Sequence, residues 1–157
     1  NVDSQTLFAA IAAIGIEATI PMTQGAWSLV WYDMKEGTLN FLRNKERPMW
    51  YAYTDDFSRL IWASQWEFIH AAAMSNDMEL HTDTSSGRPV QFWQTDEDVH
   101  YSFNLAELGK TKERPKPKAK KLEGKPKYVS MTGSYSGGSN VTGFFPVREN
   151  GSNTQGT

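Results

Sequence analysis

The stretch "GAWSLVWYDMKEGTLNFLRN", residues 25–44, predicts two strands joined by a turn. Side chains alternate along a strand, so Trp27, Leu29 and Trp31 share one face of the first strand, and Val30 lies on the other face. Neither face is polar, whereas an antiparallel hairpin at a protein surface has one hydrated face. The hairpin is therefore expected to be an inner layer, and much of its cover is expected to come from outside this chain.

Length and composition limit the class of protein. The chain has 157 residues, which suits one domain, and it has no cysteine. No disulfide, thiolate metal site or cysteine nucleophile can therefore come from it. No segment approaches the length of a membrane span, and the N-terminus lacks the pattern of a signal peptide. We expect no membrane association and a cytoplasmic location.

Charge is unevenly distributed along the chain. Residues 1–109 contain six Lys or Arg and 15 Asp or Glu, a net charge of −9. Residues 110–157 contain ten and three, a net of +7, and the two parts add up to the −2 of the whole chain. We predict a folded part over residues 1–109, a basic Pro/Lys-rich linker over 110–127 and a mostly irregular Gly/Ser/Asn-rich tail over 128–157.

Hydrophobic spacing predicts the elements of the folded part. A helix is expected near residues 4–14, after a cap at Asp3 or Ser4 and before Gly15. Four consecutive antiparallel strands are expected between residues 25 and 64, followed by a helix over 65–75. Shorter strands are expected at residues 78–82, 89–94 and 99–105. The large side chains expected to be buried are Trp27, Leu29, Trp31, Phe41, Trp50 and Trp62.

This order of elements favours an α+β fold. Sequential strands that are apolar on both faces need a layer on each side. Two stacked antiparallel sheets with helices outside would provide these layers.

Five short motifs fall in this region in a fixed order. They are "DSQTL" at 3–7, "GAWSLVWYD" at 25–33, "LNFLRN" at 39–44, "RPMWY" at 47–51 and "WASQ" at 62–65. In order and spacing they resemble the second half of a class II glutamine amidotransferase domain, of the N-terminal-nucleophile hydrolase fold. Residues 78–105 also look like the closing strands of that family. The resemblance implies part of a four-layer αββα sandwich with antiparallel sheets.

The departures from the family pattern concern the catalytic machinery. Family members begin with a cysteine nucleophile, and an Asn-Gly pair and an arginine complete the site. These belong to the family's first half, whereas this chain begins at Asn1. Gln5 and Gln65 replace glutamates, and Asn44 replaces an aspartate, departures that also suit a divergent, phage-like protein.

The resemblance implies that the chain is the C-terminal portion of an amidotransferase that hydrolyses glutamine to glutamate and ammonia. Its expected partners are the missing N-terminal half of the domain and glutamine, and the chain alone is expected to be inactive. The alternative is a non-catalytic structural or protein-interaction module derived from the same fold.

Asp3 is the one position that maps onto a substrate contact of the family. There the carboxylate receives the α-ammonium group of glutamine, a strong charge-assisted interaction. The alternative is a plain helix N-cap. No catalytic residue and no cofactor are predicted. His70, His81 and His100 are isolated in the sequence, so no metal site is predicted.

Other polar groups are expected to be structural. Arg43 and Arg47 are expected to pair or pack, and residues 96–98 to form a turn. "YSGGSN" at 135–140 is read as tail and not as a pyrophosphate loop. The basic tract could attract an acidic protein partner. It lacks interleaved aromatic residues, so nucleic acid is not an expected partner.

Overall fold

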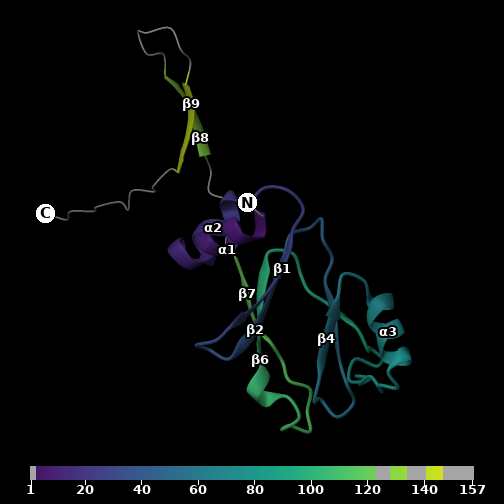
Figure 1. Cartoon of the computed structure of the whole chain (residues 1–157). Helices are drawn as coiled ribbons and strands as arrows, with labels where there is room; N and C mark the ends of the chain where they lie inside the picture. Colours follow the sequence, from purple (N-terminus) through teal and green to yellow (C-terminus); the bar gives the residue numbers. More distant parts are fainter. Residues whose placement is uncertain (1–2, 123–127, 134–140, 147–157) are drawn as a thin grey trace, which may run out of the picture. The chain divides into compact units, whose positions relative to one another are not determined.

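The computed structural model describes residues 3–122, 128–133 and 141–146. The chain divides into two compact units (Figure 1). The larger unit spans Gln24–Leu122, and the smaller one joins Asn1–Thr23 with Glu123–Thr157.

The smaller unit contains helices and a hairpin. Its elements are α1 (Asp3–Ile14), α2 (Ile16–Thr19), the 3-10 helix η1 (Ile20–Met22) and the antiparallel pair β8 (Tyr128–Gly133) and β9 (Val141–Pro146). The helix predicted at 4–14 is confirmed as α1. It ends at Ile14, and the φ of 84° at the following residue, Gly15, lies in the left-handed region that glycine adopts most easily.

The predicted tail differs from the structure where it is described. Residues 128–133 and 141–146 pair as strands, so this part of the tail is not irregular. Residues 135–140, with the glycine-rich motif, lie outside the described residues.

The larger unit contains two antiparallel sheets. The four-stranded sheet has the order β1 (Ser28–Asp33), β2 (Thr38–Arg43), β6 (Val99–Asn104) and β7 (Lys118–Lys121). The three-stranded sheet has the order β4 (Leu60–Ala63), β3 (Trp50–Tyr53) and β5 (Trp93–Gln94). The four strands predicted between residues 25 and 64 are thus present, with the first two in one sheet and the last two in the other. A 3-10 helix η2 (Leu105–Glu107) follows β6.

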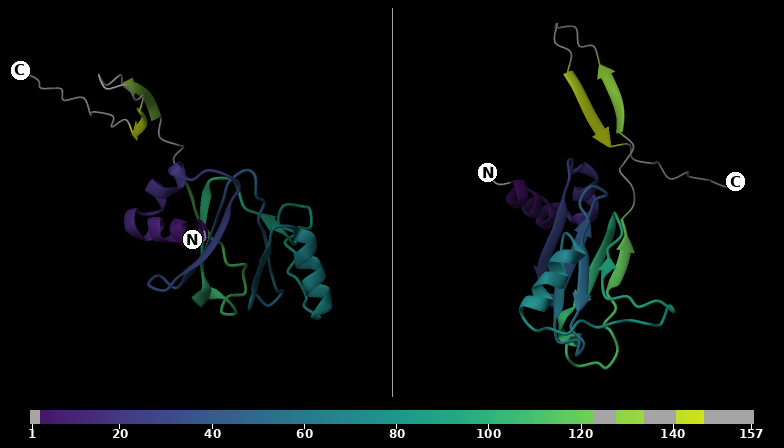
Figure 2. Two further views of the ribbon diagram at one scale, coloured as in Figure 1. Left: turned by 45° about the horizontal axis from the view of Figure 1, so that its top comes forward. Right: turned by 90° about the vertical axis from the view of Figure 1, so that its right-hand side faces the viewer.

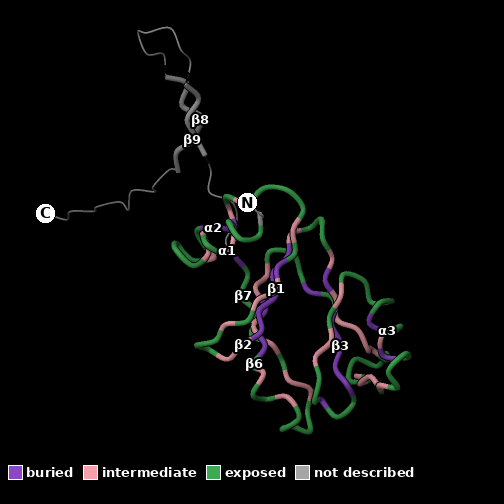
Figure 3. The backbone as a smooth tube through the Cα atoms, viewed as in Figure 1, coloured by how far each residue is buried: buried purple, intermediate pink, exposed green. Residues whose placement is uncertain are grey.

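The two sheets pack face to face through aromatic side chains. Phe41 on β2 lies with its ring centroid 6.5 Å from that of Tyr51 on β3 and 4.8 Å from that of Phe103 on β6. Tyr51 and Phe103 are themselves 5.1 Å apart. In Figure 3 the buried stretches lie on strands of both sheets, whereas the loops are largely exposed. The core of this unit therefore lies between the sheets.

Helix α3 (Trp66–Ser75) forms an outer layer on the three-stranded sheet (Figure 2). It packs on β3 and β4 and buries Ile69 and Ala73. Because side chains alternate on β3, Ala52 faces the helix while Tyr51 faces the other sheet. The helix predicted over 65–75 is confirmed.

The burial predictions hold in part. Leu29 and Phe41 are buried, and Trp27, Trp31 and Trp50 are half-buried. The prediction was wrong for Trp62, which is 43% exposed. The reason is its position on β4, an edge strand of the three-stranded sheet.

The basic tract also differs from its prediction as a linker. Lys118–Lys121 form β7 and pair with β6, and Leu122 is buried. The Tyr53 hydroxyl donates a hydrogen bond of 2.8 Å to the carbonyl oxygen of Pro115. The folded unit therefore continues to Leu122 and does not end at residue 109.

Candidate functional site

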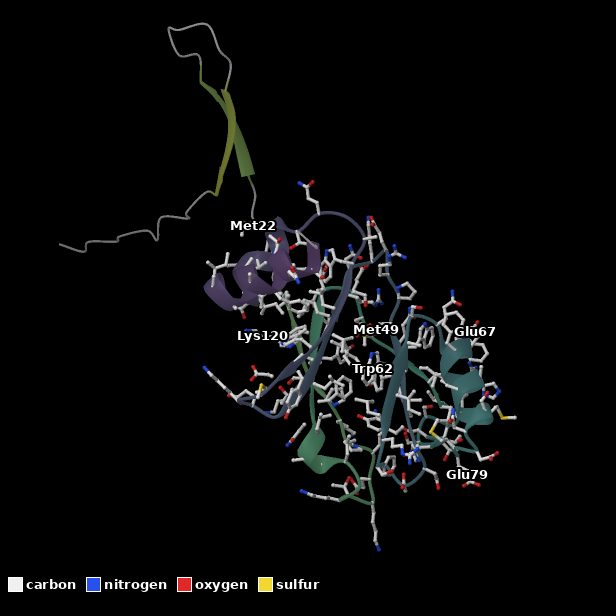
Figure 4. All side chains as sticks on the ribbon, viewed as in Figure 1. Met22, Met49, Trp62, Glu67, Glu79 and Lys120 are labelled. Carbon is white, nitrogen blue, oxygen red and sulfur yellow. The ribbon has the colours of Figure 1, made fainter. Side chains whose placement is uncertain are left out.

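One side of the two-sheet unit ends in two open strand edges. Strand β1 is the last strand of its sheet and β4 the last strand of the other. They lie at the same end, because Trp62 on β4 packs 5.6 Å from Phe41 on β2, the neighbour of β1. Figure 4 labels Trp62 and Met49 in the region between the sheets.

The register shows which backbone groups of β1 point outward. Asn44 N–H donates to Trp27 O, so these two residues form a hydrogen-bonded pair. Such pairs recur at every second residue of an antiparallel ladder, here at Leu29 and Trp31, whose backbone groups face β2. The backbone groups of Val30 and Tyr32 are therefore directed away from β2.

Strand β4 also has backbone groups that point outward. Thr54 N–H donates to Arg59 O, so the backbone groups of Leu60 and Trp62 are directed away from β3. We call Val30 and Tyr32 of β1 and Leu60 and Trp62 of β4 the open side.

Two large aromatic side chains of the open side are exposed. Tyr32 is 53% exposed and Trp62 43%. Open strand edges with apolar side chains are sites of further strand pairing or of protein contact. The open side is therefore the candidate functional surface of this chain.

Two of the quoted motifs meet at a polar joint beside β1. Asn44 Oδ1 accepts a hydrogen bond from the backbone N–H of Trp27 at 3.3 Å, and its Nδ2 donates to the carbonyl oxygen of Gly25 at 2.6 Å. The second bond needs the amide of asparagine, because an ionised aspartate has no donor. The amide of Asn44 thus has a structural use here.

Arg43 ties the two sheets together. This side chain is buried, and its Nε donates to the carbonyl oxygen of Thr95 at 2.8 Å. Its Nη1 donates to Asn44 O at 3.1 Å, and the Thr95 hydroxyl donates to Met49 O at 3.3 Å. The predicted packing role of Arg43 is confirmed. Arg47 is exposed.

Asp3 is the first residue of α1, and its side chain lies outside the described part of the chain. Its role in substrate binding stays a prediction.

Gln65 is the N-cap residue of α3 and forms no capping hydrogen bond through its side chain. The acidic turn is confirmed: Asp98 has a φ of 56°, and Asp96 accepts a hydrogen bond of 2.7 Å from the Tyr101 hydroxyl.

His81, isolated in the sequence, has a carboxylate beside it in the structure. Its Nδ1 lies 3.6 Å from Asp55 Oδ1, and its ring centroid lies 4.5 Å from that of Phe57. The fold creates this pair by joining distant parts of the chain, so sequence spacing could not reveal it.

His100 is half-buried on β6. Its ring stacks on Trp31 at 5.2 Å, and its Nε2 lies 3.0 Å from Asn40 Oδ1. The Asn40 amide nitrogen donates to Thr38, so Oδ1 is an acceptor and the imidazole Nε2 carries the proton. Burial lowers the pKa of His100, which favours the neutral ring. His70 is exposed on α3, as predicted for a helix-face histidine.

Arg114 was missed by sequence reasoning because it lies in a run of lysines and prolines. Its guanidinium carbon lies 4.5 Å from the ring centroid of Trp93, and its Nε lies 3.7 Å from Asp83 Oδ2. Burial raises the pKa of the nearby Tyr51 and of Tyr53, so both phenols are neutral. This cluster holds the segment before β7 against the three-stranded sheet.

A shallow hollow of about 370 Å³ lies between the end of β3 and the end of α3. Its lining comprises Thr54, Asp55, Asp56, Ser58, Arg59, Asn76, Asp77, Met78 and Glu79. Hydrogen bonds from Thr54 and Ser58 lower the pKa of Asp56 to about 2. These bonds are local to one turn, and they account for the low pKa of Asp56 without a ligand.

Within the described residues, no group of three or more His, Asp or Glu side chains is arranged to hold a metal ion. Likewise, none of the helices seen in that part of the chain is both long enough and apolar enough to cross a membrane. Comparison of the chain with protein-family models, curated proteins and solved structures finds no match.

Proposed function

We propose that this chain is the C-terminal portion of a glutamine amidotransferase domain. The supporting observation is that each quoted motif lies on a helix or strand, or on the junction of the two. The five quoted motifs fall on α1, β1, β2, β3 and the β4–α3 junction, in the order that the resemblance implies. The elements carrying the last four motifs belong to one unit with two facing sheets and an outer helix.

The complete domain is proposed to have four layers, αββα. The two sheets of the larger unit are the inner layers and α3 is one outer layer. A second helical layer would cover the outer face of the four-stranded sheet. Leu29 of β1 and Leu42 of β2, which share that face, are both buried, which is consistent with a covered face.

The open side is proposed as the surface that meets the missing half of the domain. Strands added beside β1 and β4 would pair with the outward backbone groups and cover Tyr32 and Trp62. That half would carry the cysteine thiolate, which attacks the carboxamide carbon of glutamine. Ammonia leaves, and water hydrolyses the acyl-enzyme to release glutamate.

In this scheme the described chain contributes binding and support. The Asp3 carboxylate would receive the substrate ammonium, and the Arg43–Thr95 joint would hold the two sheets in register. No nucleophile of the required kind is present in the 157 residues. The chain by itself is therefore expected to be inactive.

A non-catalytic interaction module is the second candidate function. It is favoured by Gln5 and Gln65, which stand where the family has carboxylates, and by the exposed apolar residues of the open side. The two candidates differ in what precedes Asn1. A Met-Cys start and an Asn-Gly pair in the reading frame favour the amidotransferase, and their absence favours the module.

Asp3→Asn in the complete protein tests the substrate role. Asparagine is a good N-cap, so the thermal midpoint should change little. Loss of the charge facing the ammonium should weaken glutamine binding by about 1.5–3 kcal/mol, or about 10- to 150-fold. Asp77→Asn is the matched control, because Asp77 is exposed and has a φ of 48° that asparagine tolerates. A lower midpoint with unchanged glutaminase kinetics would reduce Asp3 to a cap.

A further inference from the structure

The outer edge of the four-stranded sheet is formed by a strand of unusual composition. Strand β7 has the sequence KAKK, and all four residues, 118–121, are exposed. It pairs with β6 on one side and is the last strand of the sheet. Figure 4 shows Lys120 on the side of the four-stranded sheet and Glu67 on the side of α3.

The register shows which backbone groups of β7 remain open. Leu122 N–H donates to Asp98 O, and the pairs His100–Lys120 and Ser102–Lys118 follow at alternate positions of the same ladder. The N–H and C=O groups of Ala119 and Lys121 are therefore directed away from β6. A further strand can pair at these two residues.

The charge around this edge is concentrated in one segment. Residues 110–122 contain seven Lys or Arg and one Glu, whereas residues 24–109 contain six basic and 13 acidic side chains. The edge strand is thus the basic margin of an otherwise acidic unit. A ligand that combines negative charge with an extended backbone complements both features.

We propose that β7 is a docking strand for an extended acidic peptide of a partner protein. The peptide adds a strand to the sheet by pairing with the backbone of Ala119 and Lys121. Its Asp or Glu residues lie across from Lys118 on one face of the sheet and from Lys121 on the other. The proposal does not depend on the amidotransferase proposal.

The geometry favours a peptide over a nucleic acid. Phosphate groups only accept hydrogen bonds, so they leave the outward C=O groups of Ala119 and Lys121 without donors. A peptide strand offers donors and acceptors in alternation. Lysines on an edge also prevent pairing with a second basic edge, and the same charges attract an acidic strand.

The test uses the 157-residue chain and a fluorescently labelled peptide that alternates Glu with Thr and Val. We expect the peptide to bind, with affinity that falls as salt is raised. Lys118→Glu/Lys121→Glu should weaken binding about tenfold or more. The matched control is Lys35→Glu/Lys45→Glu, which changes the net charge equally at exposed residues outside β7 and its partner strand β6 and should retain the affinity.

Strand pairing is tested separately from charge. Ala119→Pro removes an N–H that β6 does not use, so it should weaken binding about tenfold while the circular dichroism spectrum is unchanged. An acidic peptide with proline at alternate positions should not bind. No binding of the alternating peptide overturns the proposal. Equal binding of the proline peptide, or of a single-stranded oligonucleotide, reduces the edge to a charged surface and also overturns it. If Ala119→Pro does not fold, the comparison of the alternating peptide with the proline peptide decides whether the backbones pair.

Discussion

Phe41→Ala is the substitution that tests the packing of the two sheets. Phe41 is fully buried and contacts aromatic residues on three other strands: Tyr51, Trp62 and Phe103. The matched control is Phe68→Ala, the same chemical change at a side chain on α3 that is 58% exposed.

The expected losses of stability differ because the two environments differ. Truncating a fully buried phenylalanine leaves a cavity and lowers the free energy of unfolding by about 3–5 kcal/mol. The three aromatic contacts place Phe41 toward the upper end of that range. Less than half of the Phe68 side chain is buried, so truncation removes little buried surface. Alanine is also a better helix former than phenylalanine. Its truncation should therefore cost about 1 kcal/mol or less.

Urea denaturation followed by tryptophan fluorescence measures both losses. Trp62 lies beside Phe41 and reports on the region between the sheets. The fluorescence transition should coincide with that seen by circular dichroism for each variant. If the two variants lose the same free energy within about 0.5 kcal/mol, the sheets do not pack through Phe41 and the two-sheet unit is wrong.

Two further predictions concern hydrogen bonds. Asn44→Asp removes the donor to Gly25 O and should destabilise the chain by about 1 kcal/mol at neutral pH. The difference from wild type should shrink in acid, where a protonated carboxyl can donate, and a difference independent of pH would contradict this. Burial and the bond to Asp96 raise the pKa of Tyr101 from 10.0 to about 12. Because the folded-state pKa is the higher one, this stabilisation is present below pH 10 and is lost as the pH rises toward 12. In urea denaturation, Tyr101→Phe should lose less stability than wild type between pH 10 and 12. Tyr51 and Tyr53 remain in the variant and contribute in the same direction, so some loss persists. An identical loss in both proteins would refute the raised pKa of Tyr101.

The sequence was sufficient for elements whose patterns are local. Apolar residues at helical spacing predict α1 and α3, and alternation with polar turns predicts β1 to β4. These elements have the expected order because their signals depend on neighbouring residues alone.

Features that depend on distant contacts could not be read from the sequence. The four residues of β7 read as solvated linker, since an edge strand needs no apolar face. Arg114 looks like one more basic residue until Trp93 is brought within 4.5 Å of it. The His81–Asp55 pair likewise joins residues whose proximity is created by the fold.

The candidate functional surface was foreseen only in outline. The apolar character of both faces of residues 25–44 indicated that the hairpin needs cover. The structure adds that β2 is buried on both faces, whereas Tyr32 at the end of β1 is exposed. The exposed part of the hairpin is thus on β1, the strand at the edge of the sheet.

Release of ammonia from glutamine tests the central proposal most directly. The measurement compares the protein from the complete reading frame with the 157-residue chain, against a buffer control. We predict that the complete protein releases ammonia, that replacing its N-terminal cysteine abolishes the release, and that the 157-residue chain is inactive. Ammonia release by the chain alone would contradict the account, as would a complete protein that has the cysteine and binds glutamine without hydrolysing it.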